Sequence, residues 1–321
     1  MEYRRLGRTG LKVSTICLGA MQFGWTAGED DSFAILDRAA EHGVNFIDTA
    51  DVYSRWHSGD QGGESETILG RWLGRGLIAR DQVVIATKVR GRMGPGPNDA
   101  GLSRLHIMQA VEASLRRLQT DYIDLYQVHS PDEETPLEET LEALSDLVRS
   151  GKVRYIGCSN FPAWLLAKSL WISEARRLAR FDSLQPHYNL AHRAEFEREL
   201  QPLCLDQGVG VIPYSPLAAG YLTGKYRRGQ ELPDSARAGS VQRRYMHESG
   251  WATLERLMAV ASETGRTPAQ VAIGWVLANP AVSSAIIGAN SIQQLDETIQ
   301  AADVRLEADE KAALDEGSSW A

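Results

Sequence analysis

Residues 46–53 read FIDTADVY, in which an apolar pair runs directly into a cluster of ionisable side chains. The apolar residues predict a buried strand, and Asp48, Asp51 and Tyr53 follow at its carboxyl end. In α/β barrels the catalytic residues stand at the carboxyl ends of the strands, because all of those ends converge on one face. This stretch therefore predicts the fold and the position of a catalytic site together.

The same strand-then-helix unit recurs along the whole chain. Near-continuous apolar runs alternate with amphipathic helical patterns, which indicates parallel strands that are covered by helices. The first expected strand ends at residue 19, and the other expected strands are residues 46–50, 83–89, 122–129, 153–159, 183–188, 209–214 and 284–287. The expected helices are residues 31–42, 65–73, 103–118, 136–150, 162–178, 195–207, 253–263 and 268–278.

Eight such units favour a closed α/β barrel, the (β/α)8 TIM barrel, over an open doubly wound sheet. An open sheet that binds a nucleotide would carry G-x-G-x-x-G after its first strand, whereas this chain has LGAMQFG at residues 18–24. An N-terminal β-hairpin is expected around the GRTG turn at residues 7–10, and no linker divides the chain, which predicts one domain over residues 1–321. Long loops at residues 90–102 and 226–250 are expected on the catalytic face, as functional lids or mobile segments.

The composition excludes several classes of function. The chain is 43% hydrophobic and 24% charged, and its net charge of -8 argues against a nucleic-acid partner. No apolar run approaches the ~18 residues that a membrane span needs, and residues 1–10 lack a signal-peptide pattern, which together predict a cytoplasmic protein. Cys17, Cys158 and Cys204 are widely spaced, so we expect buried thiols, no disulfide framework and no metal site.

Four ionisable residues stand at the ends of three successive predicted strands. Asp48 and Tyr53 follow one strand, Lys88 ends the next and His129 ends the one after that. A lone lysine or histidine in such a place is more often structural than catalytic, but the whole set predicts a catalytic site. The alternative is an Asp–Lys pair that only closes the top of the barrel.

Eight segments carry a resemblance to a known family. They are GRTGLKVSTICLGAM (residues 7–21), FIDTADVYS with GGESETILGRWL (46–54 and 62–73), ATKV (86–89), LYQVHSPD (125–132), GCSNF (157–161), LQPHYN (184–189), PYSPLAAGYLTGKY (213–226) and IIGANSIQQLDETI (286–299). Over nearly its full length the chain resembles the aldo-keto reductase superfamily. The resemblance implies an NAD(P)H-dependent carbonyl reductase or alcohol dehydrogenase that uses Asp48, Tyr53, Lys88 and His129.

The chemistry of these four residues follows from what carbonyl reduction requires, which is a hydride on carbon and a proton for the developing alkoxide. Tyr53 would be the proton donor, although a tyrosine with an ordinary pKa near 10 is a poor acid at neutral pH. We expect Lys88 to lower that pKa and Asp48 to keep the lysine charged and aimed. His129 would orient the carbonyl and help to share the proton.

The resemblance also implies where a nicotinamide cofactor binds. Its carboxamide would be held near the ends of two strands, its ring would stack on a tyrosine, and its pyrophosphate would lie on the loop after the seventh strand. The adenosine would lie at the start of a late helix that opens at Ser291. The residues are Ser159, Asn160 and Gln185 for the carboxamide; Tyr214 for the ring; Ser215, Leu217, Gly220 and Lys225 for the phosphates; and Gly288, Asn290, Ser291, Gln294 and Glu297 for the adenosine.

The preference between the two nicotinamide cofactors depends on Asn290. It occupies a place where many relatives that prefer NADPH have an arginine on the 2'-phosphate, and Thr298 replaces a common asparagine. Arg243 or Arg244, from the long loop, could compensate. We expect NADP as the cofactor, with NAD as a second possibility.

The expected substrate pocket lies in the loops of the catalytic face. Trp25, Trp56 and His57 form an aromatic set that suits an aryl or otherwise apolar aldehyde, with simple loop packing as an equal alternative. Trp164 and Trp171 are at helical spacing and are expected in packed positions.

Three functions remain open at this stage. The first is reduction of an aldehyde or ketone, or oxidation of the corresponding alcohol. The second is a cofactor-binding regulatory subunit like the potassium-channel β subunits that share this fold, and the third is a barrel lyase or isomerase without nicotinamide. The predicted partner is a small-molecule substrate, and the sequence does not specify the oligomeric state.

Overall fold

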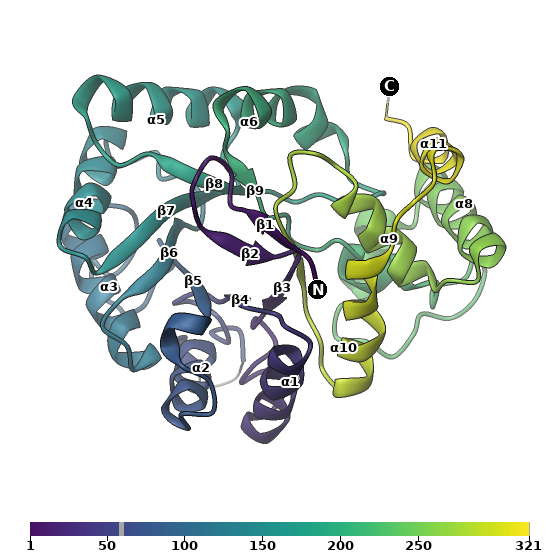
Figure 1. Cartoon of the computed structure of the whole chain (residues 1–321), viewed down its shortest axis with the longest axis horizontal. Coiled ribbons are helices and arrows are strands. Elements are labelled where there is room, and N and C mark those ends of the chain that lie inside the picture. The colour runs from purple at the N-terminus through teal and green to yellow at the C-terminus, as the bar shows by residue number, and fades with distance from the viewer. Residues whose placement is uncertain (58–60, 321) are drawn as a thin grey trace.

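The computed structural model describes residues 1–57 and 61–320, which contain a parallel eight-stranded sheet with helices packed around it (Figure 1). The strand order is β10-β3-β4-β5-β6-β7-β8-β9. The bounds are β3 Ile16–Gly19, β4 Phe46–Asp48, β5 Val84–Val89, β6 Ile123–Val128, β7 Val153–Ser159, β8 Phe181–Gln185, β9 Gly210–Val211 and β10 Ala285–Ile287.

Each connection between neighbouring strands carries at least one helix, as a parallel sheet requires. The helices are α1 Glu29–Glu41, α2 Glu64–Gly74, α3 Arg104–Leu118, α4 Leu137–Arg149, α5 Ala163–Arg176, α6 Gln201–Gln207, α7 Ala238–Tyr245, α8 Glu248–Thr264, α9 Pro268–Leu277, α10 Ile292–Ile299 and α11 Ala308–Gly317. Shorter helical turns are η1 Arg80–Gln82, η2 Phe196–Leu200, η3 Ala218–Thr223 and η4 Gln300–Asp303.

The sheet closes on itself between its two outer strands. The Ile286 N–H donates to the Pro213 carbonyl over 3.0 Å, and the Ser283 N–H donates to the Val211 carbonyl over 2.8 Å. On its other side β10 pairs with β3, with Ile286 opposite Cys17. The predicted (β/α)8 barrel is therefore confirmed.

The N-terminal hairpin pairs β1 (Tyr3–Arg5) with β2 (Lys12–Ser14) and lies against the amino ends of the strands. Gly7 has φ +57, and a Cβ at this position would meet the Gly208 carbonyl oxygen at 2.5 Å. Only glycine fits that approach at that φ. The predicted hairpin is thus confirmed, and it leaves the opposite end of the barrel for chemistry.

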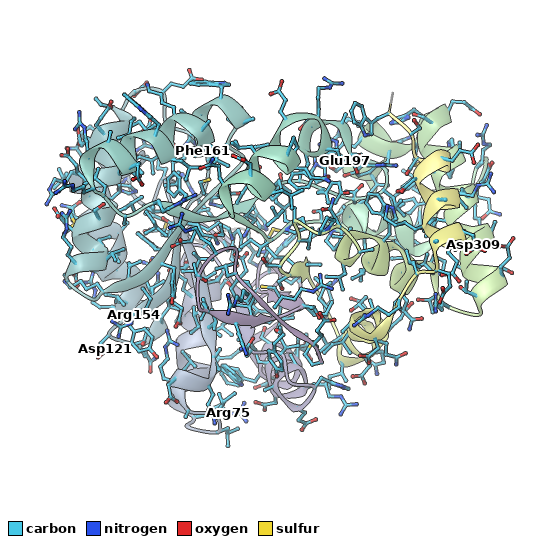
Figure 2. The ribbon with its side chains drawn as sticks, turned by 45° about the horizontal axis from the view of Figure 1, so that its top comes forward. Arg75, Asp121, Arg154, Phe161, Glu197 and Asp309 are labelled. Carbon is cyan, nitrogen blue, oxygen red and sulfur yellow. The ribbon has the colours of Figure 1, made fainter. Side chains whose placement is uncertain are left out.

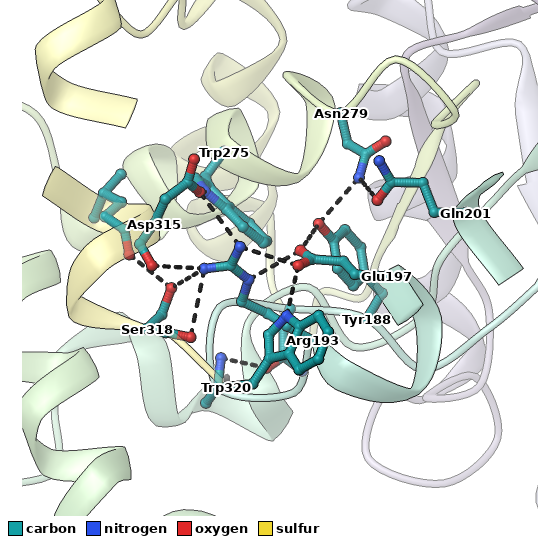
Figure 3. Close-up of polar contacts among 12 residues, drawn as sticks. Tyr188, Arg193, Glu197, Gln201, Trp275, Asn279, Asp315, Ser318 and Trp320 are labelled. Carbon is teal, nitrogen blue, oxygen red and sulfur yellow. Dashed lines mark hydrogen bonds and ion pairs between the residues drawn. The ribbon is translucent and has the colours of Figure 1, made fainter. Parts of the chain in front are cut away.

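A polar network ties the end of the chain to the barrel (Figure 3). The Arg193 guanidinium donates to Glu197 over 2.9 Å, to the Asp315 carbonyl over 2.9 Å and to the Ser318 hydroxyl over 2.8 Å. Trp320 donates to the other oxygen of Glu197 over 2.8 Å. These contacts hold α11 against the segment that follows β8.

Several expected boundaries differ from the structure for identifiable reasons. Strands β8 and β9 end at Gln185 and Val211, earlier than expected, and a proline lies beyond each end, at Pro186 and Pro213. A proline has no N–H with which to continue a strand ladder. The three cysteines are buried and free, as expected.

Two other expectations are wrong. Residues 226–250 are not a continuous loop, because α7 and the start of α8 lie within them. The apolar face of α7 contains only Val241 and Tyr245, one turn apart, and arginines surround them in the sequence.

Trp164 and Trp171 are not packed: they are 66% and 69% exposed on the outer face of α5. Four of the charged residues that are labelled in Figure 2 lie at the periphery of the molecule: Arg75, Asp121, Arg154 and Asp309.

Candidate active site

Lys88 is the centre of the site. Its ammonium donates three hydrogen bonds, to Asp48 Oδ2 over 2.6 Å, to the Thr49 carbonyl over 2.9 Å and to the Tyr53 hydroxyl over 2.9 Å. An ammonium group has three donors, so each one is used. The lysine side chain is fully buried, which fixes it in this geometry.

The sheet brings these residues together as predicted. Strand β4 ends at Asp48, which lies opposite Ala86 of β5, and Lys88 follows two residues later on the same face. The His129 N–H donates to the Val89 carbonyl over 3.0 Å, which continues the pairing of β5 with β6. The rings of Tyr53 and His129 meet edge to face, with centroids 5.9 Å apart.

Two glutamines complete the surroundings of Asp48. Gln127 Nε2 and Gln185 Nε2 donate to Asp48 Oδ1 over 3.0 Å and 2.9 Å. Gln127 is absent from the sequence prediction, although a buried amide two residues before His129 in an apolar strand was a signal for it. Gln185, expected to hold a carboxamide, turns its amide nitrogen toward the carboxylate instead.

Burial and the neighbouring groups together set the pKa values of Lys88 and Tyr53. Burial opposes the charge of Lys88, but Asp48 and Tyr53 outweigh it and raise the pKa of the lysine. Burial is also the largest influence on Tyr53 and raises its pKa, while Lys88 lowers it. Lys88 thus lowers the pKa of Tyr53, as expected, but burial has the larger effect and the pKa stays above its ordinary value. Tyr53 keeps its proton at neutral pH, the form that a proton donor needs.

His129 is neutral over the physiological range. Burial, followed by the charges of Lys88 and Arg90, lowers its pKa to about 3. A neutral imidazole offers one N–H and one lone pair. It can therefore orient a polar oxygen without adding charge.

The residues expected around the carboxamide lie side by side. Ser159 is opposite Gln185 in the β7–β8 pair, and its hydroxyl donates to the Gln185 carbonyl over 2.8 Å. Asn160 has φ +59 and donates to the His129 carbonyl over 3.0 Å. The Tyr214 hydroxyl donates to Asn160 Oδ1 over 2.9 Å. Strand pairing thus joins this set directly to the catalytic residues.

The loop after β9, where the cofactor phosphates are expected, has several residues in the left-handed backbone conformation. Ser215, Ala218, Ala219 and Gly220 all have positive φ. Successive residues in this region turn their N–H groups toward one concave side. A Cβ on Gly220 would lie 3.4 Å from the ammonium of Lys225. The positive charge of Lys225 is therefore close to this turn. Leu217 immediately precedes η3.

The segment expected at the adenosine end forms a helix start. Ser291 caps α10 by accepting the Gln294 N–H over 3.3 Å, as predicted. Gln294 Oε1 accepts the Asn290 N–H over 2.9 Å, and Asn290 Oδ1 accepts the Thr26 hydroxyl over 2.7 Å. A Cβ on Gly288 would meet the side chain of Gln22 at 2.1 Å, and Glu297 lies one turn further along α10.

The expected substrate rim is partly assembled. Trp25 and Trp56 meet edge to face with centroids 5.5 Å apart, and Trp56 lies 6.0 Å from the ring of Tyr53. The guanidinium of Arg237, at the start of α7, lies 5.7 Å from the centroid of Trp25. His57, the third residue of the expected rim, is exposed.

Asp51 is a buried carboxyl group that lies outside the four predicted catalytic residues. Neither of its oxygens has a hydrogen-bond partner among the described residues. Burial, followed by the charge of Glu66, raises its pKa well above the ordinary value. Glu66 itself is fully buried, and it is bonded to Thr87 over 2.5 Å and to Arg117 over 2.6 Å. Asp51 therefore gives up its proton at a higher pH than an ordinary aspartate.

Comparisons with known proteins agree with this geometry. The model of the Aldo/keto reductase family matches residues 15–318. The chain is 43% identical to the uncharacterized oxidoreductase YrpG of Bacillus subtilis, over 96% of this chain and 93% of that protein. It is 39% identical to the versiconal hemiacetal acetate reductase of Aspergillus parasiticus, over 98% and 96%.

A third relative carries the name of a different function. The chain is 38% identical to a probable voltage-gated potassium channel subunit beta of Arabidopsis thaliana, over 95% of this chain and 92% of that protein. The family match and the named reductases support an NAD(P)H-dependent oxidoreductase. None of the helices in the described chain is both long and apolar enough to cross a membrane. The chain belongs to the aldo/keto reductase family.

Proposed function

We propose that this protein transfers a hydride from NADPH to the carbonyl carbon of an aldehyde or ketone, and that it also catalyses the reverse oxidation of the alcohol. The observation that carries the proposal is the hydrogen bond of 2.9 Å from a fully buried lysine ammonium to the Tyr53 hydroxyl. A buried tyrosine that is bonded in this way can give up its proton to a nearby alkoxide. Its phenolate is then stabilised by an adjacent positive charge.

Each residue of the site has a separate part in the proposed reaction. The nicotinamide, when bound, supplies the hydride. The Tyr53 O–H donates the proton, and Lys88 stabilises the oxygen that is left behind. Asp48 holds Lys88 charged and in place through the 2.6 Å ion pair. His129, neutral and beside the Tyr53 ring, donates one hydrogen bond from its N–H to the substrate carbonyl oxygen.

Replacing the proton donor tests the proposal. We expect Tyr53→Phe to lower kcat for reduction of an aromatic aldehyde by about 10³-fold, because a general acid contributes roughly that factor. NADPH affinity, measured by quenching of tryptophan fluorescence, should stay within about threefold. A large loss of NADPH binding with little loss of turnover would contradict the role given to Tyr53.

The cofactor preference is part of the proposal and has its own test. Asn290 accepts a hydrogen bond from Thr26 and leaves no guanidinium at the start of α10. We expect Asn290→Arg to raise NADPH affinity by about tenfold, because a charge-assisted pair with the 2'-phosphate is gained, while NADH affinity stays the same. Equal affinities before and after the change would indicate that the 2'-phosphate is read by Arg243 or Arg244.

The aromatic rim supports an aryl or apolar substrate. Trp25 and Trp56 lie on the same side of the site as Tyr53 and offer ring edges and faces to a flat apolar group.

The three free buried cysteines suit a reducing compartment, which supports a cytoplasmic location.

A regulatory subunit is the second candidate, because of the relative named as a potassium channel subunit beta. Both functions require cofactor binding, so binding alone does not separate them. Turnover does: reduction of an aromatic aldehyde by wild type, abolished in Tyr53→Phe, supports the enzyme. NADPH binding without turnover on any aldehyde, ketone or sugar in a panel would favour the regulatory role.

A further inference from the structure

The ring of Tyr214 rests on the imidazole of His187. The two residues form a parallel bridge between the ends of β8 and β9, and their rings lie 5.2 Å apart at 9°. His187 also stacks on His192, at 4.1 Å and 25°. One face of the ring proposed to carry nicotinamide is therefore supported by a histidine that the proposed reaction does not use.

The same imidazole is bonded to helix α7. Tyr245, the last residue of α7, lies with its hydroxyl 2.9 Å from His187 Nε2, and Asn189 Nδ2 lies 3.3 Å from the same nitrogen. The orientation of Asn189 is fixed, because its Oδ1 accepts the Ala191 N–H and its Nδ2 donates to the Ser215 carbonyl. Nε2 is thus an acceptor, and Tyr245 donates to it.

A neutral imidazole is consistent with this arrangement. Burial, followed by the nearby His192 and Arg244, lowers the pKa of His187 to about 3. The Nε2 lone pair is therefore present at every pH at which the protein is expected to work. Beside this contact lies a cavity of about 690 Å³, lined in part by His187, Arg244 and Tyr245, so α7 is not packed on all sides.

The two ends of α7 reach different parts of the site. At its start Arg237 lies over Trp25 of the substrate rim, and at its end Tyr245 is bonded to His187. Beyond His187, the Tyr214 hydroxyl donates to Asn160, which is bonded to the His129 carbonyl. A continuous set of contacts thus runs from α7 to the strand ends that carry the catalytic residues.

We propose that His187 is a positioning residue that couples the docking of α7 to the orientation of the Tyr214 ring. The proposal rests on the function given above, because Tyr214 matters only if a nicotinamide stacks on it. Imidazole is suited to this part because it combines a flat face for Tyr214 with an in-plane acceptor for Tyr245. Phenylalanine supplies only the first and glutamine only the second.

The experiment measures NADPH release from the full chain, by stopped-flow tryptophan fluorescence. We expect Tyr245→Phe and His187→Phe each to raise the dissociation rate about 3- to 10-fold, the range for one lost hydrogen bond. Because both remove the same bond, the double variant should be no faster than the faster single variant. His187→Gln keeps the acceptor but loses the stack, and should also release NADPH faster.

Tyr221→Phe is the matched control. Tyr221 stacks on Tyr245 at 5.7 Å, but its hydroxyl has no hydrogen-bond partner among the residues described. It should release NADPH within twofold of wild type, and all variants should unfold within a few degrees of it. The mild Tyr245→Phe change keeps the test valid if a His187 variant fails to fold.

Two outcomes would overturn the coupling. One is a dissociation rate within twofold of wild type for Tyr245→Phe, and the other is a double variant whose effect is the product of the two single effects. Failure of the proposed function looks different, because wild type itself would then bind neither NADPH nor NADH, or would bind NADPH without reducing any carbonyl compound in the panel. That control is measured first.

Discussion

Asp48 and Asp51 lie three residues apart and are equally buried, at 2% and 1% exposure, yet they are in opposite situations. Asp48 ends β4 inside the barrel, where Lys88, Gln127 and Gln185 donate to its two oxygens. Asp51 lies in the following turn, close to Glu66 and the Arg117 guanidinium, and lacks a hydrogen bond to either oxygen within the described residues.

The two carboxyl groups differ in their hydrogen-bond partners and not in their burial. Removing a carboxylate from water costs several kcal/mol, and an ammonium with two amide donors offsets that cost. Asp51 has no such donors among the described residues, and burial raises its pKa. The proposed reaction uses the carboxyl group that is paired with the lysine.

The largest effect is expected when Asp48 loses its counter-ion. Lys88→Met should lower kcat by about 10³-fold and lower the free energy of unfolding by about 3–5 kcal/mol, because it leaves a buried carboxylate unpaired. Steady-state kinetics and urea denaturation measure the two quantities. Adding Asp48→Asn to Lys88→Met should restore about half of the lost stability without restoring activity. If the double variant is no more stable than Lys88→Met, the ion pair is not the source of the loss.

A smaller effect is expected when Asp48 keeps its lysine but loses an amide. Gln127→Leu removes the 3.0 Å bond to Asp48 Oδ1 and the acceptor used by Gln185. A hydrogen bond to a charged group contributes about 1.5–3 kcal/mol, so we expect that loss of stability and a fall in kcat of about tenfold. Unchanged kcat would mean that Gln185 alone holds the carboxylate.

The smallest effect on activity is expected at Asp51. Asp51→Asn should leave kcat within about twofold, since a neutral carboxyl and an amide have the same shape. If Asp51→Asn lowers kcat as much as Asp48→Asn does, the proposed difference between the two residues is wrong.

The difference in stability between Asp51→Asn and wild type should depend on pH in a defined direction. The folded protein releases the Asp51 proton at a higher pH than the unfolded chain, in which the group has the ordinary pKa of 3.8. The free energy of unfolding of wild type therefore falls as pH rises from there toward the folded pKa, by at most about 1.4 kcal/mol per pH unit. Asparagine has no such loss, so the variant should be more stable at pH ~7 and equal to wild type below pH ~4, as urea denaturation can show.

The sequence was sufficient for residues whose position follows from strand ends. Asp48, Lys88 and His129 could be placed together because parallel strands end on one face, and the structure brings them together with Tyr53. The cofactor residues came from resemblance, and their roles stay a prediction.

What could not be predicted depends on the direction of side chains between strands and helices. Asp51 and Asp48 look alike in FIDTADVY, and only the turn of the backbone decides which one meets the lysine. Trp164 and Trp171 fit the spacing of a buried face, but α5 turns them to solvent. Helix α7 was missed because only two of its residues are buried.

The pairing of β10 with β3 has a consequence for how the protein is made. Strand β3 emerges from the ribosome early and pairs with β4 on one edge. Its partner on the other edge, β10, begins at Ala285, so roughly 270 further residues must be synthesised before β3 and β10 can pair. At about 5–20 residues per second, β3 waits tens of seconds with one edge unpaired. The strands that carry the proposed catalytic residues are all synthesised by residue 129, long before the strand that closes the barrel.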